Sequence, residues 1–128
     1  MTNQFSENKP IYLQLADRIM DEIEREEYLP DSRLPSVREY AAKMGVNPNT
    51  MMRAYSWLQD EHIIYNKRGI GYFVYRDADS KIFRKRMNKF LDVEMPAFIK
   101  RMILLNVDFN TFDRLYRKYL FMHEGGKF

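Results

Sequence analysis

The feature that most constrains the fold is a pair of helix starts that only a very short turn separates. Ser36 and Glu39 form a Ser-x-x-Glu pattern, in which each side chain satisfies a backbone N–H group at the start of a helix. Gly45 can end that helix in a left-handed conformation, and Asn47 followed by Pro48 is typical of a new helix start. Two helices joined by so tight a turn form a helix-turn-helix.

The segments on either side extend this pair into a winged helix. Apolar residues recur every four positions from Pro10 to about Glu26, which predicts an amphipathic helix. Two short runs rich in β-branched and aromatic residues, 63–65 and 72–75, flank a basic segment that contains glycine, and they predict a β-hairpin. We therefore expect a mainly α fold with a small β-hairpin, in which a winged helix-turn-helix precedes a short C-terminal helical segment.

The second part of the chain has a different pattern. Residues 1–77 are expected to form the winged domain, and residues 78–128, after a polar hinge at 77–80, to form a two-helix segment. Pro96 predicts a kink or restart, and Asp108 can cap the last helix. Two such helices cannot enclose a core, so the winged domain or a second copy must cover their apolar faces. A ligand pocket is the alternative, but we favour a homodimer, whose expected interface residues are Phe83, Met87, Phe90, Phe98, Met102, Phe112, Tyr116 and Tyr119.

Charge is distributed unevenly along a chain whose net charge is only +3. Six acidic residues lie between Asp17 and Glu27, whereas residues 33–76 hold seven basic residues and three acidic ones. A nucleic acid would bind the second stretch and avoid the first.

The composition argues against several classes of function. The chain has no cysteine and only two histidines, His62 and His123, which excludes thiolate sites and leaves little to bind a metal. It has no glycine-rich phosphate loop and no nucleophile motif, so we expect neither an enzyme nor a cofactor. No apolar run approaches the length of a membrane span, and residues 1–10 are polar, so we expect no membrane contact and a cytoplasmic location.

Several stretches, in order along residues 10–75, resemble the GntR family of bacterial transcription regulators. They are 10–15, 34–39, 45–50 with 53–55 and Leu58, and 67–74. The short C-terminal helical segment, 78–128, resembles that of the YtrA-like subfamily, in which a helical dimerisation segment replaces a metabolite-binding domain. Glu26 and Asp31 stand where the family commonly has glycine, and a type I turn would accept Asp31. Pro48 and Met52 stand where many members have arginine or another polar residue, so the operator should differ from theirs.

The resemblance also implies how such a chain would bind double-stranded DNA. The second helix of the pair would lie in the major groove, where Asn49 can pair with adenine, Thr50 can contact a phosphate or a thymine methyl group, and Arg53 can reach guanine or a phosphate. Arg38 would hold a phosphate or a nearby guanine, and the basic hairpin would lie in or along the minor groove. Each residue could instead be an ordinary surface residue. The expected DNA-binding residues are Ser36, Arg38, Asn47, Asn49, Thr50, Arg53, Lys67, Arg68, Gly69 and Gly71.

These expectations combine into a function. We predict a sequence-specific homodimeric repressor that binds an inverted repeat and, by resemblance to YtrA-like proteins, controls its own operon with an ABC transporter. The alternative is a winged-helix module whose positive wing binds an acidic protein. The sequence leaves open the operator, any small-molecule effector, repression versus activation, and whether the basic residues of 81–89 touch DNA.

Overall fold

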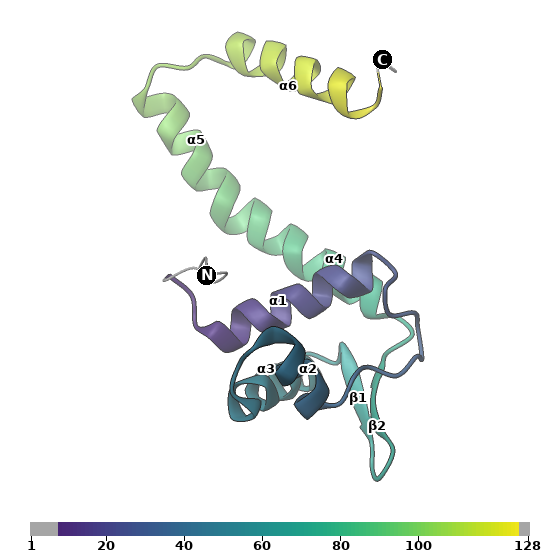
Figure 1. Ribbon diagram of the computed structural model, residues 1–128. Helices are drawn as coiled ribbons and strands as arrows, with labels where there is room; N and C mark the ends of the chain where they lie inside the picture. Colours follow the sequence, from purple (N-terminus) through teal and green to yellow (C-terminus); the bar gives the residue numbers. More distant parts are fainter. Residues whose placement is uncertain (1–7, 126–128) are drawn as a thin grey trace. The chain divides into compact units, whose positions relative to one another are not determined.

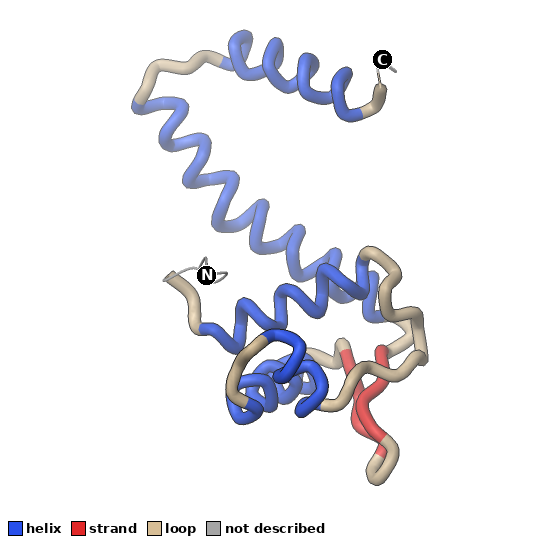
Figure 2. Tube along the Cα trace, viewed as in Figure 1, coloured by secondary structure: helices blue, strands red, loops and turns tan. Residues whose placement is uncertain are grey.

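A computed structural model describes residues 8–125, so the outer ends of the two expected domains lie outside the described residues (Figure 1). The chain divides into two compact units, with the boundary after Lys85. We call residues 8–85 the head and residues 86–125 the tail. Both are mainly helical, and the head contains a two-stranded hairpin, which is red in Figure 2.

The head has the expected winged helix-turn-helix. Its elements are α1 (Ile11–Glu24), α2 (Val37–Met44), α3 (Pro48–Asp60), β1 (Ile64–Lys67), β2 (Gly71–Val74) and the first two turns of α4 (Ala78–Lys89). The core is built from the inward faces of the helices and the inner side of the hairpin, and Met51, Tyr55 and Leu58 on the inward face of α3 are fully buried. The largest buried residues are Leu15, Ile19, Met20, Leu34, Tyr40, Met51, Tyr55, Leu58, Ile63, Ile64 and Ile82.

The predicted caps form as expected. The Ser36 hydroxyl accepts a hydrogen bond from the Glu39 amide at 3.1 Å, and the Glu39 carboxylate accepts one from the Ser36 amide at 3.0 Å. Gly45 ends α2 in the left-handed conformation, with φ at 68°. The Asn47 side chain then accepts a hydrogen bond from the Asn49 amide at 2.7 Å, and Pro48 is the first residue of α3. The sequence prediction of the helix-turn-helix is confirmed.

The prediction for the turns after α1 was partly wrong. The helix ends at Glu24 rather than near Glu26, because Glu26 adopts a left-handed conformation with φ at 64°. Asp31 also has a positive φ, 61°, so it does not occupy a type I turn. Its carboxylate accepts hydrogen bonds from the Arg76 guanidinium, at 2.8 and 3.1 Å, and from the Tyr65 hydroxyl at 3.3 Å.

Part of the segment before α2 pairs with the hairpin. The Leu34 amide donates to the Tyr72 carbonyl at 2.8 Å, and the Val74 amide donates to the Ser32 carbonyl at 3.0 Å. Arg33 forms an antiparallel bridge with Phe73. This short segment thus lies along the side of β2 that does not face β1.

The hairpin is tighter than the sequence suggested. In the register of β1 and β2, Asn66 pairs with Tyr72 and Lys67 pairs with Gly71, so Asn66, Lys67 and Gly71 belong to strands rather than to the tip. The connecting loop is residues 68–70, and the Ile70 amide donates back to the Lys67 carbonyl at 2.9 Å.

A carboxylate is buried between α1 and α2. Glu22 is only 6% exposed, and it accepts a hydrogen bond of 2.6 Å from the Tyr40 hydroxyl. Burial and the hydrogen bond to Glu22 raise the pKa of Tyr40 far above its usual value. The two helices therefore share a polar contact inside an otherwise apolar core, and losing either partner would leave the other unsatisfied.

The prediction of a polar hinge at 77–80 is wrong. Helix α4 begins at Ala78 and packs against the rest of the head. Ala78 and Ile82 are buried in the core. Lys81 donates to the His62 carbonyl at 2.6 Å, and Lys85 forms an ion pair with Glu61 at the end of α3. Two of the basic residues in 81–89 thus form polar contacts with other elements of the head.

The tail consists of the end of α4, a π-helical turn η1 (Phe90–Glu94), α5 (Met95–Leu104) and α6 (Phe109–His123). The irregularity expected at Pro96 is this π-turn, which precedes a proline that lacks an amide hydrogen. The Asp108 cap is confirmed, since its carboxylate accepts a hydrogen bond from the Thr111 amide at 2.9 Å.

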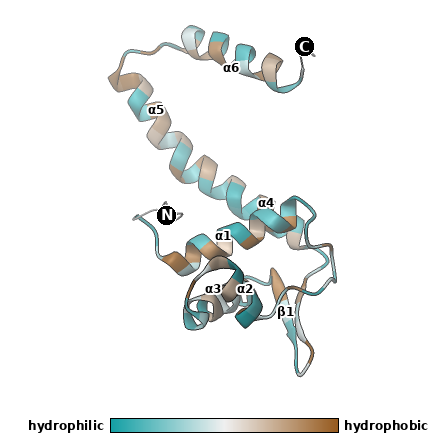
Figure 3. Ribbon diagram, in the orientation of Figure 1, coloured by the Kyte–Doolittle hydropathy of each residue, from teal (hydrophilic) through white to brown (hydrophobic). Residues whose placement is uncertain are grey.

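The tail buries no residue in η1, α5 or α6 as described. Hydrophobic residues nevertheless recur along both helices, as Figure 3 shows. Phe98, Ile103, Phe109 and Tyr119 are between 51% and 71% exposed. Over residues 8–125, no helix combines the length and the apolar character that crossing a membrane requires.

Candidate nucleic-acid interface

The outward face of α3 brings two predicted residues together. Asn49 and Arg53 are both exposed and lie one turn apart, on the side of the helix opposite the buried Met51 and Tyr55. Ser56, which the sequence analysis did not select, is exposed and continues the same face. An outward face of this kind can enter the major groove of DNA.

The start of α3 is both capped and accessible. Asn47 is exposed, and its side-chain oxygen already accepts the Asn49 amide. The side-chain NH2 group of Asn47 can still donate two hydrogen bonds. Thr50 is half-buried on the flank of the helix. The two residues can therefore contribute at most at the edge of the Asn49–Arg53 face.

The start of α2 places a second group of predicted residues. Arg38 is exposed in the first turn, and Ser36 is half-buried as the cap. Hydrogen bonds from Ser36 lower the pKa of Glu39, so this carboxylate keeps its negative charge at the helix start. That charge opposes a phosphate directly on the helix end, which leaves Arg38 as the group at this start that can attract one.

The hairpin carries the basic tip that was predicted. Lys67 is exposed with its ammonium 4.6 Å from the centre of the Phe73 ring, and Arg68 and Gly69 are exposed in the loop. Gly69 has φ at 78°, a conformation that favours glycine. Ile70 is 57% exposed and adds an apolar group to the tip.

Gly71 has an intramolecular neighbour that the sequence analysis missed. Its φ is 146°, and a Cβ at this position would lie 2.8 Å from Nε of Arg33. The guanidinium of Arg33 therefore lies directly against the strand, and the positive φ of Gly71 is a conformation that favours glycine. No local pattern around Arg33 could have indicated this, because the contact joins residues far apart in the sequence.

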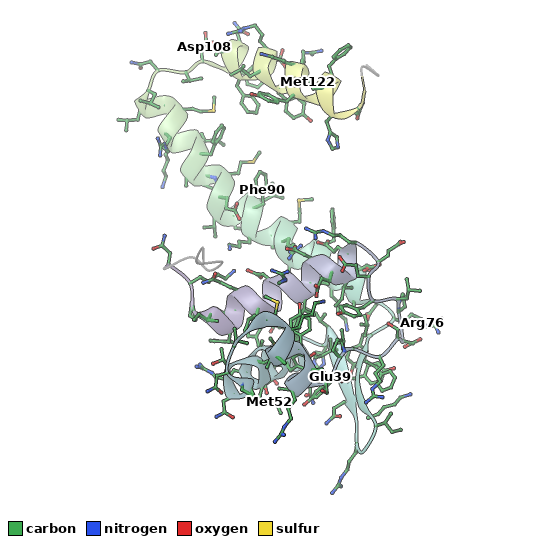
Figure 4. The ribbon with its side chains drawn as sticks, viewed as in Figure 1. Glu39, Met52, Arg76, Phe90, Asp108 and Met122 are labelled. Atoms are coloured by element: carbon green, nitrogen blue, oxygen red, sulfur yellow. The ribbon has the colours of Figure 1, made fainter. Side chains whose placement is uncertain are left out.

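The hairpin is packed against α3. Tyr72 of β2 contacts Tyr55 edge-to-face, with ring centres 5.0 Å apart, and its hydroxyl lies 3.9 Å from the sulfur of Met52. In Figure 1 the tip of the hairpin extends away from α1, and Figure 4 places Met52 of α3 and Glu39 of α2 on that lower side. The head thus holds α3 and the basic hairpin in a fixed relation, and α3 also packs against α1.

The predicted interface residues of the second part do not form one unit. Phe83 precedes the unit boundary and is 60% exposed on α4. In the tail, Phe112 contacts Phe98 and Tyr116 at ring distances of 6.1 and 6.0 Å. These rings and Phe90 and Met102 help line an apolar hollow of about 880 Å³. Within residues 8–125, no three or more His, Cys, Asp or Glu side chains gather in a way that could hold a metal ion.

Known proteins resemble this chain in sequence. The family described as "Bacterial regulatory proteins, gntR family" matches residues 11–74. The HTH-type transcriptional regulator YhcF of Bacillus subtilis is 42% identical over 102 residues, which cover 80% of this chain and 83% of YhcF. The HTH-type transcriptional repressor YtrA of the same organism is 35% identical over 78 residues, 61% of this chain and 60% of YtrA.

Solved structures resemble the chain in fold. A putative transcriptional regulator of the GntR family from Bacteroides thetaiotaomicron has a TM-score of 0.80 and 41% identity, and the match covers 88% of this chain and 98% of that one. The DNA-binding domain of AraR, solved in complex with operator ORX1, has a TM-score of 0.51 and 29% identity over 58% of this chain and 90% of its own.

Proposed function

We propose that this chain, which belongs to the GntR family of bacterial regulatory proteins, is a homodimeric repressor that binds an inverted-repeat operator and acts in the cytoplasm. Within the family it is YtrA-like. One observation carries the proposal: Asn49 and Arg53 share an exposed face of α3, and the same head holds a basic hairpin against that helix. Major-groove and minor-groove contacts are thereby available from one rigid unit.

The proposed contacts divide into those that read bases and those that hold the backbone. Asn49 pairs with adenine and Arg53 with guanine, since their side chains match the donor and acceptor patterns of these bases. Arg38 and Lys67 bind phosphates, which sets the register of the head without selecting a sequence. The DNA-binding domain of AraR, which resembles this head, was solved in complex with an operator, and this supports DNA binding by the head.

In a dimer, the second copy of the head binds the second half of the inverted repeat. One head makes too few base contacts to select an operator, and a two-fold pair doubles them. The tail exposes aromatic residues and buries none in its last two helices, so a second copy is the natural cover. By resemblance to YtrA-like regulators, the regulated genes are its own operon with an ABC transporter.

Selection of bound sequences from a random pool of duplexes tests this function. We expect wild type to recover an inverted repeat, Arg53→Ala to lose preference at particular base pairs, and Lys67→Ala to bind all sequences more weakly but with unchanged preference. A lost base contact should reduce discrimination about 5- to 150-fold at its position.

Salt and competitor DNA provide the control. Binding to the selected duplex should persist in excess unrelated DNA and weaken steeply as salt rises. A chain that recovers no common sequence, and instead binds an acidic protein through its wing, would refute the proposal.

A further inference from the structure

Arg53 does not project freely from α3. Its guanidinium carbon lies 4.3 Å from the centre of the Tyr12 ring, a cation–π contact. Tyr12 lies in the first turn of α1 and is half-buried against the hydrophobic core, whereas Arg53 is exposed. A ring fixed by one helix therefore holds the flexible end of a side chain that belongs to another helix.

The stacked arginine lies on the face of α3 that the proposed function uses. Arg53 follows Asn49 by one turn, and the buried Met51 and Tyr55 point to the other side of the helix. The Tyr12 ring thus reaches the edge of the surface that would read bases, although it comes from the helix with the acidic face.

Stacking leaves the arginine able to bind a base. The guanidinium lies over the face of the ring, and its five N–H donors lie around the edge of its own plane. Two of these donors can reach O6 and N7 of one guanine. An arginine that is already held in place loses less conformational freedom on binding than one that moves freely.

We propose that Tyr12 is a positioning residue for base recognition: its ring face holds the Arg53 guanidinium in the orientation that contacts one guanine. The inference rests on the proposed function, because it needs a base contact by Arg53. Only the ring face is required, so the hydroxyl of Tyr12 has no part in it.

A purely structural role for this contact would have different consequences. If Tyr12 only fixed α1 against α3, changing its ring would lower the free energy of unfolding and weaken binding to every duplex by the same factor. Positioning instead predicts a loss of discrimination at a single base pair, the one at which Arg53→Ala also loses it.

A series of fluorinated rings at position 12 separates the two roles. The full-length chain is made with phenylalanine there, and then with phenylalanine bearing one, two or three ring fluorines. Fluorine withdraws electron density from the ring face at nearly constant size, so the cation–π attraction falls stepwise while packing is kept. Affinity is measured for the duplex that wild type selects and for duplexes changed at one base pair.

We expect Tyr12→Phe to keep wild-type discrimination within about twofold, and the trifluorinated ring to reduce it about fivefold at the Arg53 base pair alone. In an Arg53→Ala background the series should have no effect, because the partner of the ring is gone. Thermal unfolding of each protein shows that the fold is unchanged.

The matched control is the same series at Tyr75. This ring is also half-buried and carries Lys81 at 4.5 Å from its centre, but it belongs to no proposed base contact. Discrimination should stay constant throughout that series. A change as large as at position 12 would overturn the inference.

Two other outcomes would overturn it and are distinguishable. If the position 12 series is flat or weakens all duplexes equally, while Arg53→Ala still loses one base pair, only this inference fails. If wild type selects no sequence, the proposed function fails together with it.

Discussion

At the scale of the residue, two backbone positions explain unusual choices in this sequence. Glu26 and Asp31 have φ values of 64° and 61°, where a side chain is strained and glycine is not. Asp31 compensates through hydrogen bonds with Arg76 and Tyr65. Glu26 is exposed in the turn after α1, so the strain there has less to offset it.

Replacing Glu26 with glycine should therefore stabilise the protein. We expect Glu26→Gly to raise the free energy of unfolding by about 0.5–1 kcal/mol, because relief of the left-handed strain exceeds the extra freedom of the unfolded chain. Urea denaturation measures the change. Glu27→Gly, at the next position, where φ is not positive, should give no gain; equal effects of the two substitutions would contradict the explanation.

At the scale of the element, the sequence predicted those features that depend on neighbouring residues alone. The caps at Ser36, Asn47 and Asp108 act within one turn, so the sequence shows them directly. The pairing of residues 32–34 with β2 and the docking of α4 through Ile82 depend on contacts between distant segments. The same limit applied to the site: the family resemblance implied roles for Asn49 and Arg53, whereas the neighbours Arg33 and Tyr12 come from distant segments and were not predicted.

The π-turn before Pro96 has a geometric effect on the apolar face of the tail. The Met95 amide donates to the Phe90 carbonyl, five residues earlier, rather than to the residue four earlier. In a regular helix, at about 100° per residue, Phe98 would lie about 80° around the axis from Phe90. The wider turn accommodates an extra residue and brings Phe98 back toward the line of Phe90.

Deleting one residue from this turn should be tolerated. We expect a variant that lacks Asp92 and carries Pro96→Ala to form a regular helix with the same apolar line, and to keep the mass of the proposed dimer in sedimentation analysis. Deleting Lys100 instead, within the regular α5, rotates the rest of that helix by about 100° and should abolish dimerisation. If both deletion variants were dimeric, or both monomeric, the π-turn would not be what aligns Phe98 with Phe90.

At the scale of the whole molecule, the head has a core of its own and the tail does not. Buried residues run through α1, α2, α3 and the hairpin, and η1, α5 and α6 contribute none. The proposed second copy is what would complete the tail.

A charge in the tail should therefore separate the copies. We expect Phe98→Glu to give a monomer by sedimentation analysis and to lower affinity for the inverted repeat at least about 100-fold, because two linked heads bind far more tightly than one. Lys118→Glu, at an exposed polar position on α6, is the control and should remain dimeric. A dimeric Phe98→Glu would place the interface elsewhere.

A tail without a core also makes the protein sensitive to its own abundance. In the proposed dimer, where most chains are single, halving the supply of chain lowers the paired form about fourfold by mass action. Occupancy of the operator then depends more steeply on the concentration of the chain than it would for a regulator that binds DNA as a monomer.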